Sequence, residues 1–145
     1  MADPPLTSSP ASTNTDPAEV VRAFLAALDA LDVDGLLELT DPDIVYVNRG
    51  LPPARGIDAF AKQMRGMTRR ATGFEARIHH LATEGDVVLT ERTDVIEYGR
   101  FRLEFWVCGT FEVRDGRVVL WRDAFDYVNL TVAMLRGLAR MAARR

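Results

Sequence analysis

Three charged residues, Arg92, Asp94 and Asp123, stand at positions where the sequence predicts apolar strand faces. Side chains two residues apart in a strand point to the same face, so Arg92 and Asp94 share one. Asp123 shares its face with Trp121 and Phe125. A carboxylate on an apolar face costs free energy unless it is paired or functional. Two carboxylates with a guanidinium between them form an acid/base couple, so the pattern indicates a site that transfers protons.

Two further polar residues, Tyr46 and Asn48, share an expected strand face with Ile44. If the three strand faces line one concavity, it holds two carboxylates, a guanidinium, a phenol and an amide. The rigid fork of Arg92 can bond both acids at once. Burial raises the pKa of a carboxylate and a nearby cation lowers it, so one aspartate can stay protonated as acid while the other is ionised as base. Tyr46 and Asn48 would then hold a water molecule for the base.

A plainer interpretation of the same residues is also open. Arginine and aspartate on strands usually form solvated cross-strand pairs, which contribute well under about 1 kcal/mol. Strand alternation does not by itself bring three strands together, and Asp126 is an alternative partner to Asp123. The residue types also do not say which aspartate would be the acid and which the base.

Hydrophobic periodicity and turn residues divide the chain into helices and strands. A disordered tail is expected at residues 1–15, which are rich in Pro, Ser, Thr and Ala. A single domain is expected at residues 16–145. The expected helices cover 17–31, 34–39, 57–69 and 129–143, and the expected strands 44–48, 74–82, 86–97, 101–113 and 117–126. Helices followed by hairpin-joined strands favour an α+β fold, a curved and mostly antiparallel sheet packed on N-terminal helices.

The apolar residues around the polar group predict the kind of ligand. Binding sites for small molecules are mostly apolar, with a few polar groups that fix orientation. The residues expected to line this pocket are Phe60, Met64, Phe105, Trp121 and Phe125. Such a lining would suit a bulky apolar ring system, terpene or steroid in kind.

Composition and charge exclude several classes of function. The formal net charge of −3 gives no electrostatic case for nucleic-acid binding. No apolar run approaches the ~20 residues of a membrane span. The N-terminus lacks the basic start and apolar stretch of a secretory signal, so the cytoplasm is the expected location. Cys108, the single cysteine, excludes an intrachain disulfide and is expected to be a buried structural thiol.

The motifs predict neither a metal nor an organic cofactor. His79 and His80 are adjacent in an expected strand, so they should point to opposite faces and cannot chelate one metal together. The sequence contains no nucleophile elbow and no Rossmann or P-loop glycine pattern.

Three segments, residues 45–48 (VYVN), 89–94 (LTERTD) and 120–126 (LWRDAFD), give the chain a resemblance to the limonene-1,2-epoxide hydrolase family. The resemblance covers residues 17–140 approximately. It implies a cone-shaped fold of the nuclear-transport-factor-2-like (SnoaL-like) type and a homodimer. It also implies one-step hydrolysis of an epoxide to a vicinal diol, with no metal and no organic cofactor.

The resemblance also assigns a role to each polar residue. Asp123 would be the base that takes a proton from water, and Tyr46 and Asn48 would hold that water. Asp94 would be the acid that protonates the epoxide oxygen. Arg92 would bridge the two aspartates.

Two other features extend this expectation. Ala124 stands where the family leads us to expect an aromatic residue, which predicts a wider pocket. Trp106, on the polar face of the 101–113 strand, and the Leu/Met stripe of residues 129–143 predict contacts with a second copy of the chain.

Two alternative functions belong to the same fold. One is a ketosteroid-isomerase-like or cyclase-like enzyme, which would abstract a proton from carbon. The other is a non-catalytic binder of an apolar small molecule, because a fold does not fix a function. A pair of residues able to hold water beside a base favours hydrolysis over the isomerase-like or cyclase-like reaction. The binder stays open, and a change of Asp123 would separate it, because a binder should keep its ligand while a hydrolase should lose turnover.

Overall fold

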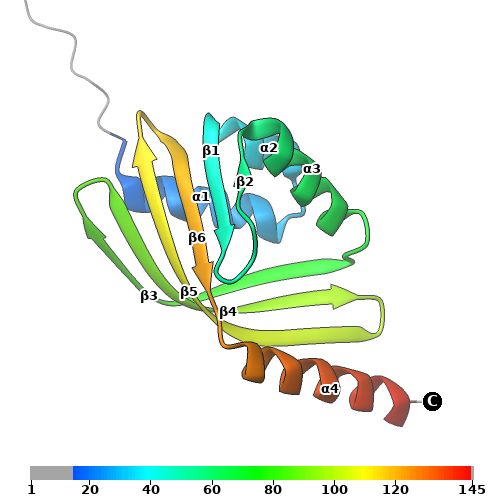
Figure 1. Ribbon diagram of the computed structural model, residues 1–145. Coiled ribbons are helices and arrows are strands. Elements are labelled where there is room, and N and C mark those ends of the chain that lie inside the picture. Colours follow the sequence, from blue (N-terminus) through cyan, green and yellow to red (C-terminus); the bar gives the residue numbers. More distant parts are fainter. Residues whose placement is uncertain (1–14, 145) are drawn as a thin grey trace, which may run out of the picture.

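The computed structural model describes residues 15–144 as a six-stranded sheet with four helices (Figure 1). The helices are α1 (Pro17–Asp29), α2 (Val33–Glu38), α3 (Ile57–Thr68) and α4 (Tyr127–Ala143). The strands are β1 (Thr40–Asn48), β2 (Ala54–Arg55), β3 (Gly73–Glu84), β4 (Val87–Tyr98), β5 (Phe101–Arg114) and β6 (Arg117–Ala124). Their order is β2-β1-β6-β5-β4-β3, and only β1 and β6 pair in parallel. The expected α+β fold with a mostly antiparallel sheet is confirmed.

Most of the tail expected at residues 1–15 lies outside the described residues, which begin at Thr15. Residue 145 also lies outside them. Within the described part of the chain, no helix is long and apolar enough to cross a membrane.

Helix α1 holds the core against the sheet. Asp16 caps it, because the Asp16 carboxylate accepts a hydrogen bond from the Ala18 amide at 3.0 Å. Figure 1 shows α1 running behind the strands. The fully buried ring of Phe24 lies 5.3 Å from the ring of Trp121 and 6.0 Å from that of Phe111. We call the face of the sheet that α1 covers the inner face, and the opposite face the outer face.

The register of the strands aligns two rows of inner-face residues across β1, β6, β5 and β4. The first row is aromatic and apolar: Tyr46, Trp121, Phe111 and Val88. The second row, two residues further along each strand, is polar or small: Asn48, Asp123, Gly109 and Thr90. Polar groups therefore stand directly beside the aromatic core.

Some boundaries differ from those that the sequence predicts. Strand β1 begins at Thr40 rather than at residue 44, so it includes the Asp41-Pro42-Asp43 segment. Proline has no backbone N–H to donate to a neighbouring strand. Pro42 is tolerated because the pairing of β1 with β6 is already irregular between Thr40 and Val45. The short strand β2 was not among the expected strands, because its two residues are too few to give a periodic signal.

A bulge in β3 makes the expectation for the two histidines wrong. The pairing of β3 with β4 shifts between Ile78 and His80, which leaves His79 as an extra residue. His79 Nε2 lies 2.8 Å from Thr93 Oγ1, and His80 Nε2 lies 3.9 Å from Glu91 Oε2. Because Thr93 and Glu91 alternate with the inner-face residues of β4, both histidines stand on the outer face.

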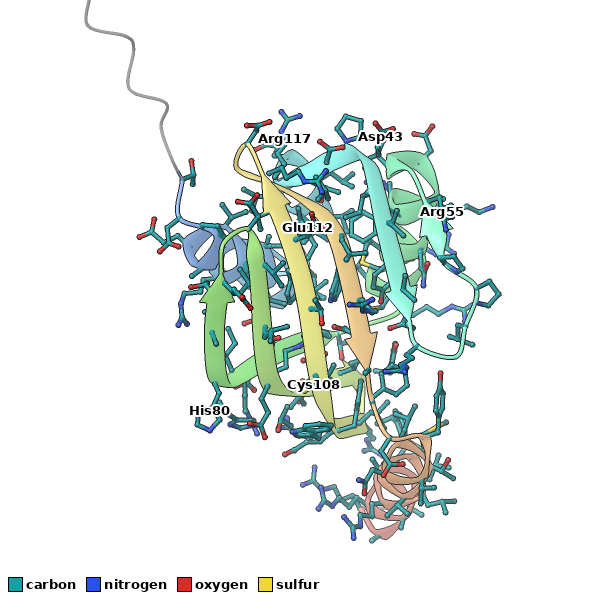
Figure 2. All side chains as sticks on the ribbon, turned by 60° about the vertical axis from the view of Figure 1, so that its left-hand side comes forward. Asp43, Arg55, His80, Cys108, Glu112 and Arg117 are labelled. Atoms are coloured by element: carbon teal, nitrogen blue, oxygen red, sulfur yellow. The ribbon has the colours of Figure 1, made fainter. Side chains whose placement is uncertain are left out.

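Cys108 also differs from expectation, since its thiol is exposed rather than buried. It alternates with inner-face Val107 and Gly109 on β5, so it points to the outer face. Figure 2 shows Cys108 and Glu112 along β5 on the side turned toward the viewer, with the helices α1 and α3 behind the strands. No helix of residues 15–144 covers this part of the sheet, so the thiol stays accessible.

Candidate active site

The guanidinium of Arg92 joins two carboxylates from different strands. Its Nε and Nη2 atoms donate to the two oxygens of Asp94 at 2.7 and 3.1 Å. Nη2 also donates to Asp123 Oδ2 at 2.5 Å. Arg92 is fully buried, so the solvated cross-strand pair considered above does not describe it. The expectation that Arg92, Asp94 and Asp123 meet is confirmed, while Asp126 instead caps α4 through the Val128 amide.

Two further hydrogen bonds that the sequence did not suggest complete this cluster. Trp121 Nε1 donates to Asp123 Oδ1 at 2.7 Å, and Arg92 Nη1 donates to Thr90 Oγ1 at 3.2 Å. Trp121 was expected only as a pocket wall. Within residues 15–144, no buried side-chain nitrogen or oxygen lacks a hydrogen-bond partner. The charged cluster is thus fully bonded, as burial of charge requires.

Tyr46 and Asn48 form a second polar pair beside Asp123. Asn48 Nδ2 donates to the Tyr46 hydroxyl oxygen at 2.9 Å, and Asn48 lies opposite Asp123 in the β1–β6 pairing. The Tyr46 ring packs 4.5 Å from that of Trp121, which fixes its direction. Burial, and then the nearby charge of Asp123, raise the pKa of Tyr46, so its hydroxyl keeps its proton and can donate it in a hydrogen bond.

Burial dominates the acidity of the two carboxylates. Burial raises the pKa of Asp123 to about 6, although the positive charge of Arg92 acts in the opposite direction. Burial likewise raises the pKa of Asp94 against the same cation. Burial alone would lower the pKa of Arg92, but the two carboxylates outweigh it, so Arg92 stays charged. Two like charges that share one buried cation can therefore retain a proton near neutral pH.

The polar cluster forms one end of a cavity of about 270 Å³. Four polar side chains face it from the sheet: Tyr46, Asn48, Asp94 and Asp123. The remaining lining residues are Leu28, Gln63, Met64, Met67, Phe74, Ile96, Phe105, Trp121 and Phe125. Arg92 is absent from this lining because it lies behind the carboxylates. The site thus combines a polar end with an apolar body, as ligand sites commonly do.

Four of the five residues expected to line the cavity do so, and Phe60 does not. Phe60 is fully buried, with its ring 5.6 Å from the ring of Tyr46 and 6.2 Å from that of Trp121. One turn of α3 separates it from Met64, which reaches the cavity. Phe60 therefore supports the ring of Tyr46 from behind rather than touching a ligand.

The expectation for Ala124 is also wrong. Ala124 follows Asp123 in β6 and is paired with Cys108, so it faces the outer side of the sheet. It does not line the cavity, so its small size cannot widen the pocket. Five cavity residues were not predicted from the sequence: Leu28 on α1, Gln63 and Met67 on α3, Phe74 on β3 and Ile96 on β4.

The described residues offer no evident metal centre. Among residues 15–144, no group of three or more His, Cys, Asp and Glu side chains is arranged to hold a metal ion. The two carboxylates of the cluster are already bonded by Arg92.

Comparison with known proteins identifies the family. Residues 15–136 match the model of a protein family described as "Limonene-1,2-epoxide hydrolase catalytic domain". The chain is 46% identical over 121 residues to the epoxide hydrolase EphG of Mycobacterium tuberculosis, covering 83% of this chain and 80% of that protein.

Solved structures give the same relationship. A limonene-epoxide-hydrolase-like epoxide hydrolase from Mycobacterium tuberculosis superposes with a TM-score of 0.84 at 43% identity, over 90% of this chain and 98% of that one. A putative SnoaL-like polyketide cyclase from Shewanella putrefaciens has a TM-score of 0.75 at 12% identity, over 89% of this chain and 99% of that one. The second likeness shows the fold alone. The fold implied by the sequence resemblance is confirmed.

The raised pKa of Asp123 predicts how stability depends on pH. Between pH 3.8 and about 6 the unfolded chain has released the Asp123 proton while the folded chain still holds it. The free energy of unfolding should therefore fall as the pH rises through this window, by on the order of 3 kcal/mol in total. Asp123→Asn removes this titration, so urea unfolding of the variant between pH 4 and 7 should show a smaller fall. Equal slopes in the parent and the variant would contradict the assignment.

Proposed function

The chain belongs to the limonene-1,2-epoxide hydrolase family and is an epoxide hydrolase, and we propose that it opens a lipophilic epoxide to a vicinal diol by one-step attack of water. The observation that carries this proposal is the Arg92 bridge between two buried aspartates at the polar end of an apolar cavity. No metal or organic cofactor takes part in the proposed reaction.

Asp123 is the proposed base. It lies opposite Asn48, and its charge acts on the buried Tyr46, so these three side chains surround one part of the cavity. A water held by the Tyr46–Asn48 pair would lie next to the Asp123 carboxylate. With a pKa of about 6, Asp123 is ionised at neutral pH yet is a stronger base than an ordinary aspartate.

Asp94 is the proposed acid. It lies on β4, opposite Phe105 and away from the Tyr46–Asn48 pair, so an epoxide between the two carboxylates could contact Asp94 through its oxygen. The water oxygen forms a bond to one epoxide carbon while the bond from that carbon to the ring oxygen breaks. Asp123 takes the water proton and Asp94 supplies a proton to the ring oxygen. Proton exchange with solvent then returns both carboxyl groups to their starting states.

Arg92 links the two proton transfers of this single step. Because it bonds both carboxylates, it holds them at a fixed separation and stabilises whichever one is ionised. The negative charge passes from Asp123 to Asp94 during the reaction, and the guanidinium stays in contact with both. A cation already in place needs no reorganisation in the transition state, which is how preorganised sites lower a barrier.

The cavity supports a terpene- or steroid-like substrate. Its apolar lining includes Met64, Met67, Phe74, Ile96 and Phe105, which would exclude water from a hydrocarbon ring. Its volume of about 270 Å³ lies just below the ~300–1,000 Å³ usual for small-molecule sites. A compact ring carrying the epoxide would fill the buried end, and any larger body would extend toward the exposed side chain of Gln63.

We also propose that the protein is a cytoplasmic homodimer. The exposed apolar side chains of α4 include Val128, Leu135 and Leu138, at 72%, 61% and 47% exposure, and Trp106 is 43% exposed on the outer face. Such a large apolar surface on one helix favours contact with a second protein surface. The unpaired, exposed thiol of Cys108 is suited to a reducing compartment.

The acid and base roles predict that Asp123→Asn and Asp94→Asn each reduce hydrolysis by about 10²–10⁴-fold, the usual contribution of a positioned acid or base. Both changes conserve shape, so circular dichroism should match the parent. Asp126→Asn is the matched control, because asparagine also caps helices and Asp126 lies outside the cavity. Near-parental turnover in either cavity variant would remove that residue from the mechanism.

Direct attack by water predicts the origin of the new oxygen atom. A single turnover in oxygen-18 water, with enzyme in excess over epoxide, should give diol that carries the label at once. A carboxylate nucleophile would instead form an ester with the substrate, and its first diol would be unlabelled while the aspartate acquired label in later cycles. Mass spectrometry of the diol and of the peptide around Asp123 separates the two routes.

The dimer proposal predicts twice the chain mass by light scattering at micromolar concentration. Leu135→Glu combined with Leu138→Glu places charge on the apolar face of α4 and should shift the protein toward monomer. Leu51→Glu is the control, since Leu51 is 54% exposed but lies in the loop before β2. A monomeric parent, or a dimer unaffected by the helix variants, would contradict a role for α4.

A further inference from the structure

Gly109 stands in the interior of β5, where glycine is unfavourable. A glycine in a strand adds backbone entropy to the unfolded state and offers no side chain to pack. Five glycines among residues 15–144 have positive φ angles that favour glycine: Gly50, Gly56, Gly85, Gly99 and Gly116. Gly109 is not among them. Its backbone therefore gives no reason for glycine, and the reason must lie in the space around it.

The space above Gly109 is occupied by the charged cluster. A Cβ atom at this position would lie 2.3 Å from Arg92 Nη1, 2.7 Å from Thr90 Oγ1 and 3.1 Å from Asp123 Oδ1. Strand β5 lies between β4, which carries Arg92, and β6, which carries Asp123. Gly109 is the residue of β5 paired with both Thr90 and Asp123. The guanidinium thus crosses β5 directly over the one inner-face position that has no side chain.

We propose that Gly109 is a positioning residue of the hydrolase, whose missing side chain lets the guanidinium of Arg92 lie against the sheet and reach Asp123. This inference rests on the acid and base roles proposed above. It adds a residue that touches neither substrate nor water, and that acts only through the place it leaves for Arg92.

The arginine, rather than the strand, would yield to a methyl group. Nη1 is the end of a flexible side chain, whereas Gly109 is fixed by pairing on both sides. Four hydrogen bonds hold the guanidinium in its plane, to Thr90, Asp94 and Asp123. A fork that moves as a rigid unit cannot clear a methyl group and keep all four. The contact to Asp123, which spans β5, is the one most affected.

Loss of that contact has a chemical signature. The positive charge of Arg92 lowers the pKa of Asp123 against the effect of burial. When the guanidinium moves away, Asp123 should bind its proton more tightly and become a usable base only at higher pH. A purely structural defect would reduce the amount of folded enzyme without changing this titration.

The test is the pH dependence of kcat/KM in Gly109→Ala, which reports the groups of the free enzyme. We expect kcat to fall at least about tenfold, and the acidic limb to move upward by about one to three pH units, the usual influence of a close opposite charge. Gly66→Ala is the matched control, because a Cβ on Gly66 in α3 meets nothing within 4 Å. The control should keep the parental profile. An unshifted acidic limb in Gly109→Ala would overturn the proposal.

A stability cycle tests the same contact without using activity. Gly109→Ala should lower the thermal unfolding midpoint in the parent, and lower it much less in Arg92→Gln, which lacks the Nη1 atom. If Gly109→Ala alone does not fold, the double variant should fold as well as Arg92→Gln alone, which is the reference for the cost of losing the guanidinium. An equal penalty in both backgrounds, or a double variant that does not fold where Arg92→Gln alone does, would show that the methyl group is excluded by something other than the guanidinium. Because no substrate is involved, this result stands apart from any failure of the proposed acid and base roles.

Discussion

The burial of one arginine between two aspartates is the constraint on which the rest of the site depends. Moving such charges out of water is expensive, and a close pair of opposite charges often does no more than offset that cost. Removing one partner of a buried pair typically costs ~3–5 kcal/mol, because the other charge is left alone. Arg92 meets this demand with hydrogen bonds to Thr90, Asp94 and Asp123. An apolar cluster of equal volume would stabilise the fold as well, so the charges are best explained by the reaction.

The sheet makes this burial possible because its register fixes the distance between the charges. Asp94 and Asp123 lie on strands separated by β5, and a long side chain is needed to join them. The aromatic row beside the cluster supplies the low-polarity surroundings that raise the pKa of both carboxylates. Trp121 belongs to both environments, since its ring packs on Phe24 while its indole nitrogen bonds Asp123. The hydrophobic core and the proposed base are therefore held by the same side chain.

Strand alternation predicted which polar residues face inward, and that part of the site followed from the sequence. Arg92 and Asp94 needed only the period of two, which holds along β4. The period of two failed at His79, because a β-bulge inserts one extra residue there. No residue type in the sequence indicated this bulge. Phe60 and Met64 are one helical turn apart and equally apolar, so only the packed structure shows that one faces Tyr46 and the other the cavity. A lone glycine in a predicted strand, such as Gly109, indicates that another group approaches the backbone closely. Only the structure shows that this group is the guanidinium of Arg92.

One part of the cavity's apolar wall comes from helix α3, which contributes none of the residues that bond Arg92. The hydrogen bonds of Arg92 go to residues of β4 and β6, whereas Gln63, Met64 and Met67 reach the cavity from α3. Substitutions on this helix can reshape the space for a substrate while leaving the electrostatics of the sheet untouched. Substrate preference and proton transfer can then evolve almost independently of each other. A fold with this arrangement can acquire new substrates while it keeps its catalytic residues.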